Sequence, residues 1–168
     1  MYFFTATINS WKHLLQEDAL KQILLDSFSW FHSNNRAAIN GFVVMPNHFH
    51  LLWTPMVGYQ KMKNEDALLS FTGHQFRKAL EKSDPFLLSQ YRSQQADREY
   101  QFWERRPRSI EIKSRSIAEQ KLVYIHHNPL QEHWGLVSRP EDYRFSSARF
   151  YLLNEQSHDF LKHYMDFI

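Results

Sequence analysis

The sequence predicts an α+β domain of the ferredoxin-like, split βαβ type, with an antiparallel sheet and helices on one face. Segments rich in β-branched and aromatic residues alternate with segments of helical periodicity in the order β-α-β-β-α-β. A Met-Pro-Asn turn separates the two consecutive strands, as is typical of a hairpin. A C-terminal helix that contains Tyr124, followed by an extension, completes the predicted fold.

The first half of the chain is expected to contain three strands and one helix. The stretch YFFTATI at 2–8 is β-branched and aromatic, which predicts a strand. Residues 20–34 carry apolar side chains at the spacing of an amphipathic helix. Strands are expected at 38–45 and 48–54, joined by the turn at 45–47, where proline removes a ladder donor.

The next segments predict a second helix and a fourth strand. Residues 64–82 have helical periodicity and acidic residues in the first turn, with Asn64 as the expected N-cap. Residues 83–97 are polar and irregular, so a loop or a short helix is expected there. The aromatic stretch EYQFWE at 99–104 is the candidate fourth strand.

A third helix is expected at 115–128. Ser116 and Glu119 have the spacing of a capping box at its start, and Pro129 marks its end. Residues 130–151 are expected to be coil with short elements.

The composition suits one packed domain. The chain has 168 residues, of which 43% are hydrophobic and 16% aromatic. We expect a single domain over 1–168, with a core at about 2–151 and a tail at 152–168 that forms a small helix. The aromatic residues supply core material, and aromatic rings also stack on unpaired bases.

Several protein classes are excluded or disfavoured. The chain has no cysteine, which excludes disulfides and thiolate metal sites. No apolar stretch reaches the ~18 residues of a membrane span, and the N-terminus lacks the features of a signal peptide. The expected location is therefore the cytoplasm, without membrane association. The net charge of +2 is only mildly basic and by itself indicates no partner.

Two histidines interrupt the predicted strand at NHFHLLW. Side chains alternate along a strand, so His48 and His50 project to one side, with Cα atoms about 6.5 Å apart, and Phe49 projects to the other. Two imidazoles at that separation can bind one cation, although a hydrogen-bonded surface pair at a sheet edge is the alternative. A third ligand must come from elsewhere in the chain.

The helix sequence LVYIHHNP supplies a phenol and candidate ligands. At about 100° per residue, Asn128 lies about 40° from Tyr124, and His127 about 60° from it on the other side. His126 points nearly opposite. The alternative for Tyr124 is a residue packed against the sheet with its hydroxyl at the rim.

These residue types suit phosphoryl transfer. A divalent ion held by His48, His50 and a helix side chain polarises a phosphodiester and orients the leaving 3′ oxygen. A tyrosine that attacks the phosphorus forms a covalent 5′-phosphotyrosine and frees a 3′-hydroxyl, which conserves the bond energy for rejoining.

Separate motifs in one order resemble a known family. The stretch VVMPNHFHLLW resembles the His–hydrophobic–His segment of single-tyrosine HUH transposases of the insertion-sequence type. The stretch YIHHNPLQEHWGLVSRPEDYRFSSARFY is similar to the C-terminal segment of REP-associated tyrosine transposases, where a YIxxNP helix precedes GLV and then PEDYRWSS. Here Phe145 replaces the usual tryptophan. The stretch QFWERRP resembles another segment of these proteins, and the resemblance spans about residues 2–151.

The resemblance implies roles for individual residues. His48 and His50 match the metal-binding histidines, and Tyr124 matches the nucleophile. Asn128 falls where the family has its third ligand, with His127 as the alternative. The resemblance also implies Mg²⁺ or Mn²⁺ as the metal and single-stranded DNA with hairpin structure as the substrate. It further implies a homodimer, with a monomer as the alternative, and a nucleoid-associated location in the cytoplasm.

The expected function is therefore that of a DNA transposase, a single-strand endonuclease with a tyrosine nucleophile. The alternative is a domesticated, non-catalytic module that binds structured single-stranded DNA. A metal hydrolase of small phosphoesters is less favoured, because no acidic residue is well placed to activate water. Whether the tyrosine helix serves its own histidines or those of a partner stays open.

Basic and aromatic residues outside the motif are candidates for DNA contact. The run WERRPRSIEIKSR is rich in arginine, and one face of the second predicted helix adds further cations. A solvated loop is the alternative for the arginines, and packing is the alternative to base stacking for the tryptophan. The DNA-binding candidates are His74, Arg77, Lys78, Trp103, Arg105, Arg106 and Arg108.

Overall fold

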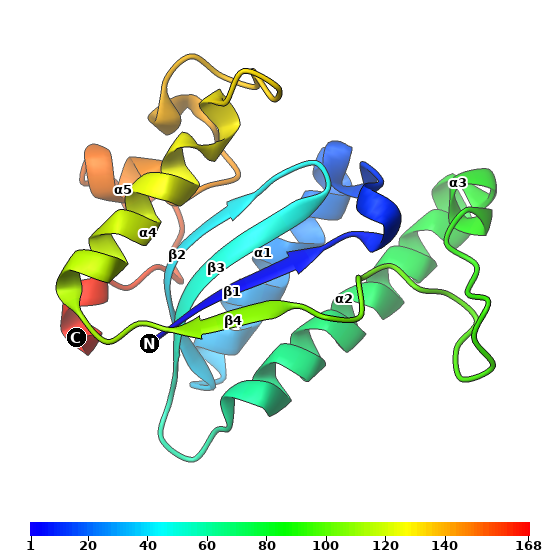
Figure 1. Ribbon diagram of the computed structural model, residues 1–168, viewed down its shortest axis with the longest axis horizontal. Coiled ribbons are helices and arrows are strands. Elements are labelled where there is room, and N and C mark those ends of the chain that lie inside the picture. Colours follow the sequence, from blue (N-terminus) through cyan, green and yellow to red (C-terminus); the bar gives the residue numbers. More distant parts are fainter.

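A computed structural model describes residues 1–168 and contains a four-stranded antiparallel sheet in the order β2-β3-β1-β4 (Figure 1). The strands are β1 (Tyr2–Thr7), β2 (Ala37–Val44), β3 (His48–Pro55) and β4 (Arg108–Glu111). The helices are α1 (Asp18–Ser33), α2 (Lys61–Ser83), α3 (Pro85–Ser89), α4 (Arg115–His127) and α5 (Ala148–Leu152). Five short 3-10 helices are η1 (Asn9–Trp11), η2 (Leu14–Gln16), η3 (Asn128–Leu130), η4 (Pro140–Asp142) and η5 (Tyr164–Phe167). The order β1-α1-β2-β3-α2-β4 confirms the predicted split βαβ fold.

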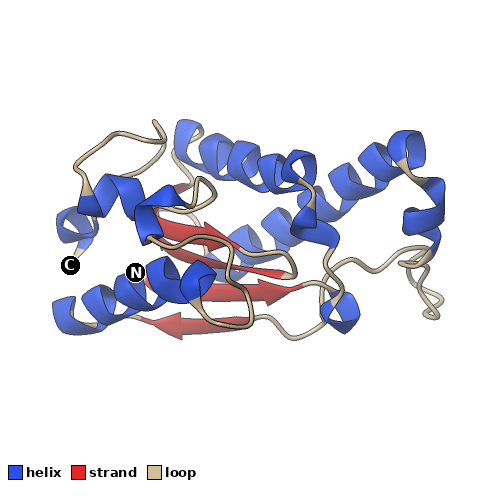
Figure 2. Ribbon diagram, turned by 90° about the horizontal axis from the view of Figure 1, so that it is seen from above, coloured by secondary structure: helices blue, strands red, loops and turns tan.

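Helices lie on both faces of the sheet (Figure 2). On one face, α1 and α2 cover a core in which the ring of Phe49 lies 5.9 Å from Phe28 of α1 and 5.7 Å from Phe4 of β1. The tyrosine-bearing helix α4 contacts β2 and β3 on the opposite face. The two helices of the βαβ pattern therefore share one face, and α4 leaves part of the other face open.

The C-terminal extension packs against the edge strand β2. Val43 pairs with Ser146 in an antiparallel bridge, and Ile39 pairs with Leu161 in a parallel one. The Phe160 ring lies 5.8 Å from that of Phe42. These contacts cover an edge that would otherwise expose unpaired backbone groups. None of the helices is both long and apolar enough to cross a membrane.

The prediction of the fourth strand at 99–104 is wrong. The strand is Arg108–Glu111, and the predicted stretch pairs only through isolated bridges such as Trp103 with Ile8. The Trp103 ring instead packs 5.4 Å from Phe49 in the core. Aromatic residues that fill a core from a loop give the same composition signal as a strand, and this is the reason for the error.

The predicted start of α2 and the predicted cap of α4 are also wrong. Helix α2 begins at Lys61, so Asn64 lies inside it, buried, and its amide donates to the backbone oxygen of Arg36 at 3.2 Å. The N-cap of α4 is Ser114, whose hydroxyl accepts from the amide of Ile117 at 3.4 Å. The capping box proposed from Ser116 and Glu119 therefore does not form. Glu119 pairs instead with Arg115 at 2.7 Å.

Candidate active site

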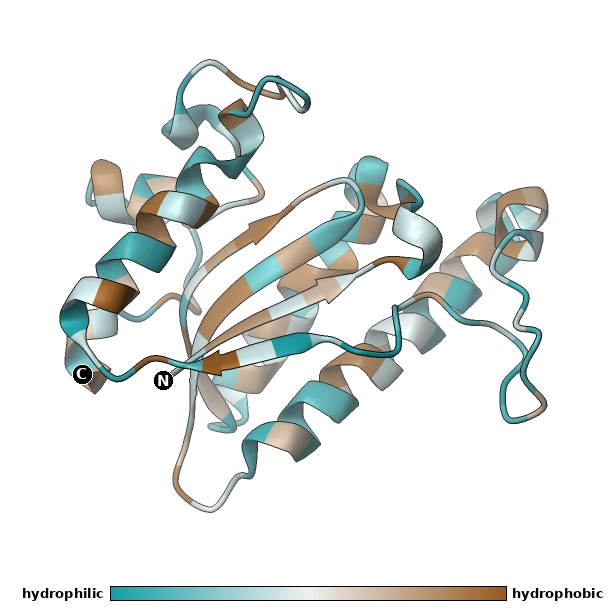
Figure 3. Cartoon of the chain, viewed as in Figure 1, coloured by the Kyte–Doolittle hydropathy of each residue, from teal (hydrophilic) through white to brown (hydrophobic).

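The histidines lie at the bottom of an open hollow of about 930 Å³ on the sheet face that α4 partly covers. We call it the histidine hollow. Figure 3 shows that the start of β3 is hydrophilic in an otherwise hydrophobic strand. The hollow is lined by Phe3, Thr5, Thr7, Trp11, His48, His50, Glu104, Arg105, Arg106, Pro107, Arg108, Ile110, Lys121, Tyr124, Asn128, Gln131, His133 and Trp134.

The ring of His48 is oriented by Asn47. The amide nitrogen of Asn47 donates to the backbone oxygen of Trp11 at 3.3 Å, so its oxygen faces the ring. That oxygen lies 2.6 Å from Nδ1 of His48. A neutral His48 therefore carries its proton on Nδ1 and has its lone pair on Nε2.

The ring of His50 is held by β1. Its Nδ1 lies 2.7 Å from the hydroxyl of Thr5, its register partner, and the ring stacks on Phe3 at 5.2 Å. Its Nε2 is buried and has no hydrogen-bond partner in the protein. A buried polar atom without a partner is costly, which points to a ligand for this nitrogen.

The two imidazoles lie side by side in the state required for metal binding. Their ring centroids are 4.8 Å apart. Burial, with a smaller contribution from His133, lowers the pKa of His48 to about 4. Burial, with smaller contributions from His48 and Lys121, lowers the pKa of His50 to about 3. Both rings are therefore neutral at pH 7, and each has a nitrogen lone pair that can bind a cation.

Helix α4 approaches the sheet closely because Gly41 has no side chain. A Cβ atom at this position would lie 2.5 Å from Cδ2 of Leu122 on α4. The buried ring of His126 fixes the helix further, since its Nε2 lies 2.8 Å from the hydroxyl of Ser147. That hydroxyl also accepts from the amide of Phe42 on β2 at 3.0 Å. His126 thus lies opposite Tyr124, as the helical spacing predicts.

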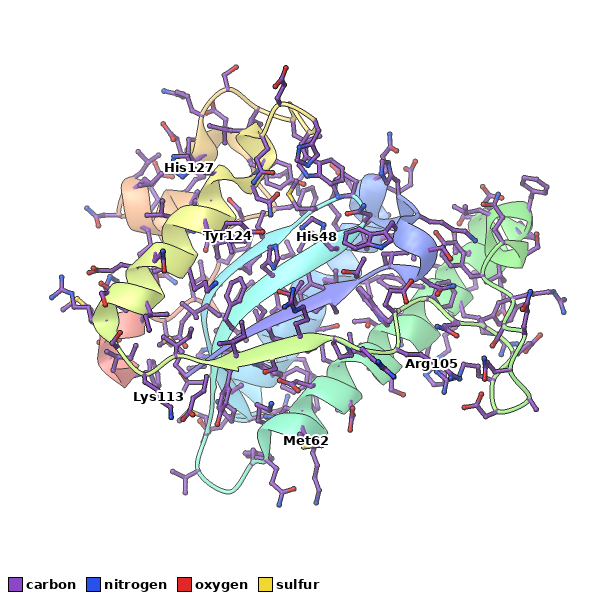
Figure 4. All side chains as sticks on the ribbon, viewed as in Figure 1. His48, Met62, Arg105, Lys113, Tyr124 and His127 are labelled. Carbon is purple, nitrogen blue, oxygen red and sulfur yellow. The ribbon has the colours of Figure 1, made fainter.

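The phenol reaches the histidine pair of its own chain (Figure 4). The Tyr124 ring lies 5.3 Å from that of His50 and 6.4 Å from Phe3. The residue lines the hollow and is 46% exposed to solvent. One turn earlier on α4, the ammonium of Lys121 lies 4.9 Å from the Phe3 ring and 5.9 Å from the Tyr124 ring. The phenol of Tyr124, the ammonium of Lys121 and the two neutral imidazoles therefore lie together within one chain.

Asn128 lies at the histidines and His127 does not. The amide nitrogen of Asn128 is 3.4 Å from Nε2 of His48, and the residue is 3% exposed. His127 is exposed on the side of α4 away from His48, and its Nδ1 lies 2.9 Å from the backbone oxygen of Val123. Amide nitrogen and oxygen are assigned from their hydrogen bonds, and a turned amide directs its oxygen at the same place.

The groups at this place are two imidazole nitrogens and the side-chain amide of Asn128, whose oxygen takes the place of its nitrogen when the amide is turned. No group of three His, Cys, Asp or Glu side chains converges anywhere in the structure. The donors that do converge suit a divalent first-row ion or Mg²⁺ that completes its shell with phosphate oxygens and water. The partnerless Nε2 of His50 fits such an ion.

The other wall of the hollow is basic. Arg105, Arg106 and Arg108 line it, and none of them forms an ion pair. Glu104 is the only acidic residue in the lining, and its carboxylate accepts from the amide of Ser10 at 2.7 Å. This wall therefore suits phosphate groups.

The remaining DNA-binding candidates lie elsewhere. His74, Arg77 and Lys78 are on α2, and the first two line a second hollow of about 760 Å³ that shares Arg105 with the histidine hollow. Arg77 is ion-paired with Glu81 and Glu99.

Trp103 packs rather than offering a stacking face. It is 8% exposed, and its Nε1 donates to the hydroxyl of Thr72 at 3.0 Å.

Sequence reasoning missed the residues that orient the site. Thr5, Asn47 and Lys121 come from three different elements or turns, and no motif marks Thr5. The adjacency of Asn47 to His48, and the one-turn spacing of Lys121 from Tyr124, are the only signals in the sequence.

One solved structure supports the fold. No protein-family model matches the chain, and no curated protein matches it. A solved REP-associated tyrosine transposase bound to a REP hairpin is similar with a TM-score of 0.62 and 20% sequence identity, over 96% of this chain and 81% of that one. A candidate transposase from Deinococcus radiodurans R1 has a TM-score of 0.49 and 18% identity, over 73% of this chain and 86% of that one. The chain is therefore similar in fold to a REP-associated tyrosine transposase, which is the family that its motifs resemble.

Proposed function

We propose that the protein is a metal-dependent, transposase-like enzyme that cleaves single-stranded DNA and transfers the strand through a 5′-phosphotyrosine. The observation that carries the proposal is the position of Tyr124, whose ring lies 5.3 Å from that of His50 at the edge of an open, basic hollow. A structural tyrosine needs neither a partnerless histidine nitrogen nor unpaired arginines beside it.

The chain supplies most of the chemistry through fixed side chains. Mg²⁺ or Mn²⁺, held by Nε2 of His48, Nε2 of His50 and the amide oxygen of Asn128, would polarise the scissile phosphate and orient the leaving 3′ oxygen. The phenol oxygen of Tyr124 attacks the phosphorus, forms an O–P bond and displaces the 3′ oxygen, which takes up a proton. The phenol proton leaves to water, because the one acidic residue of the hollow is already hydrogen-bonded to backbone.

The reverse reaction joins strands. A 3′-hydroxyl that enters the hollow attacks the phosphotyrosine, re-forms the phosphodiester and releases Tyr124. No external energy source is needed, because the phosphotyrosine conserves the bond energy. Lys121 and the arginines of the basic wall offset the phosphate charge in both directions.

Hairpin-bearing single-stranded DNA is the proposed substrate. The transposase of similar fold was solved with a REP hairpin. In this chain, the open hollow with cations on one wall suits a flexible strand. We expect a homodimer, although all the site residues named above lie in one chain.

The test is the formation of a covalent adduct. Labelled DNA hairpins with random single-stranded flanks are incubated with the protein and Mn²⁺, and the products are separated on a denaturing gel. We expect a protein–DNA adduct that is lost in Tyr124→Phe. The matched control is Tyr59→Phe, since Tyr59 is 41% exposed and does not line the hollow. Binding of the hairpins without any adduct would reject the enzyme and support a non-catalytic binding module.

A further inference from the structure

We propose that Trp11 is a stacking platform for an unpaired base of the bound strand. Its side chain lines the histidine hollow and is 64% exposed. Neither an aromatic ring nor a cation packs on this indole. The proposal rests on the proposed function in one respect: the stacked base lies next to the phosphate that His48 and His50 would hold.

The backbone holds this exposed indole in a costly conformation. Ser10 has φ 58° and Trp11 has φ 57°, so two consecutive residues with side chains occupy the left-handed region. Such residues cost on the order of 1–3 kcal/mol each and are concentrated at functional sites. The amide of Trp11 donates to the backbone oxygen of Ile8 at 2.9 Å, and the carboxylate of Glu104 accepts from the amide of Ser10 at 2.7 Å.

The same turn is connected to the metal-binding histidine. The backbone oxygen of Trp11 accepts from the amide of Asn47, and the amide oxygen of Asn47 lies 2.6 Å from Nδ1 of His48. Only one side chain therefore separates the Trp11 backbone from the His48 ring. A base on this indole belongs to a nucleotide close to the scissile phosphate.

The lining of the hollow includes side chains that suit each part of a nucleotide. A second tryptophan, Trp134, also lines the hollow, with its ring 6.1 Å from that of His48. The unpaired arginines Arg105, Arg106 and Arg108 line it as well. Phosphates favour the arginines, and the flat faces of bases favour an indole. A base in a duplex already has both faces stacked, so Trp11 selects the unpaired part of the substrate.

Another exposed tryptophan shows the contrast. Trp30 is 48% exposed on α1 but has the guanidinium of Arg36 at 5.5 Å from its ring, and it does not line the hollow. The guanidinium of Arg36 already covers the Trp30 ring, so no bound ligand is needed to explain its position. Trp30 serves as the matched control for Trp11.

The test compares two DNA chains in a binding assay that needs no cleavage. Fluorescence anisotropy measures the affinity of the full-length protein for a short oligothymidylate and for an abasic chain with the same number of phosphates. The wild-type protein is expected to prefer the oligothymidylate. In Trp11→Leu this preference should fall by roughly 5- to 150-fold, the range reported for one base–aromatic stack. Trp11→Phe should keep much of it, and Trp30→Leu should keep all of it.

The outcomes separate this inference from the proposed function. An equal loss of affinity for both chains in Trp11→Leu means that the turn acts only through Asn47 and His48, and rejects stacking. An unchanged preference in Trp11→Leu also rejects it. If the protein forms no Tyr124 adduct but still shows the Trp11-dependent preference, the stacking site is supported and the proposed enzyme is rejected. Thermal unfolding of each variant checks that the fold is intact.

Discussion

The amide nitrogen of Asn128 lies 3.4 Å from Nε2 of His48, although the two residues are 80 positions apart. This contact exists because α4 packs over β2 and β3 and ends above the start of β3. The contact favours Asn128 as the proposed third metal ligand. The alternative, His127, is exposed on another side of the helix.

The first prediction tests whether Asn128 or His127 is the third metal ligand. Asn128→Ala should weaken Mn²⁺ binding by at least about 10-fold, the scale seen when even a supporting partner of a metal ligand is removed. Isothermal titration with Mn²⁺ measures the affinity. His127→Ala is the control and should bind Mn²⁺ like the wild-type protein, because its ring is bonded to the backbone of Val123. The opposite pattern would assign the third ligand to His127.

The choice of metal follows from the same donors. A site of two imidazoles and one neutral amide attracts Mg²⁺ weakly, whereas Mn²⁺ tolerates imidazole better. Adduct formation at low metal concentration should therefore be greater with Mn²⁺ than with Mg²⁺. Equal yields over a full titration of both metals would count against this description of the site.

Gly41 should be intolerant of a side chain. In Gly41→Ala the new methyl group meets Cδ2 of Leu122 at 2.5 Å, so the buried Leu122 side chain must shift and press on the packing of α4. We expect a loss of about 1–3 kcal/mol in the free energy of unfolding, measured with urea, and a lower adduct yield because Tyr124 moves with the helix. Adding Leu122→Ala should recover adduct yield. A double variant no better than Gly41→Ala would show that the clash is not the cause.

Acid should destabilise the fold through buried histidines. Burial lowers the pKa of His126 from 6.5 to about 4, so below pH 6.5 the unfolded chain binds a proton that the folded chain does not. The stabilisation is complete above the unfolded pKa and is lost as the pH falls from about 6.5 to 4, on the order of 2–3 kcal/mol for this residue. Urea unfolding at several pH values measures it, with the comparison made between wild type and His126→Gln. A variant with the same pH dependence as the wild type would exclude His126 as a source.

The basic wall should set the salt dependence of DNA binding. Replacing both Arg105 and Arg106 with alanine removes two unpaired cations from the hollow, so the slope of log affinity against log salt should decrease by about 1.4 for a single strand. Arg139→Ala is the control, since Arg139 is paired with Asp142 and lies outside the hollow. An unchanged slope in the double variant would remove this wall from the DNA interface.

The pattern of elements could be read from the sequence because local signals agree with the final structure there. The helix expected at 115–128 is Arg115–His127, and the strand expected at 48–54 is His48–Pro55, both set by periodicity and a turn. The fourth strand could not be placed. Aromatic residues near Trp103 fill the core from a loop, while the real strand Arg108–Glu111 is short, polar and at the sheet edge.

The sequence by itself determined the split βαβ order, the shared side of His48 and His50, and the distance of one helical turn between Tyr124 and Asn128. These features depend only on local backbone geometry. Tertiary structure alone decided that α4 crosses the sheet at Gly41 and brings Tyr124 to the histidines, and that Asn47 and Thr5 orient the two rings. Such contacts join distant segments through packing, and no local pattern in a chain specifies them.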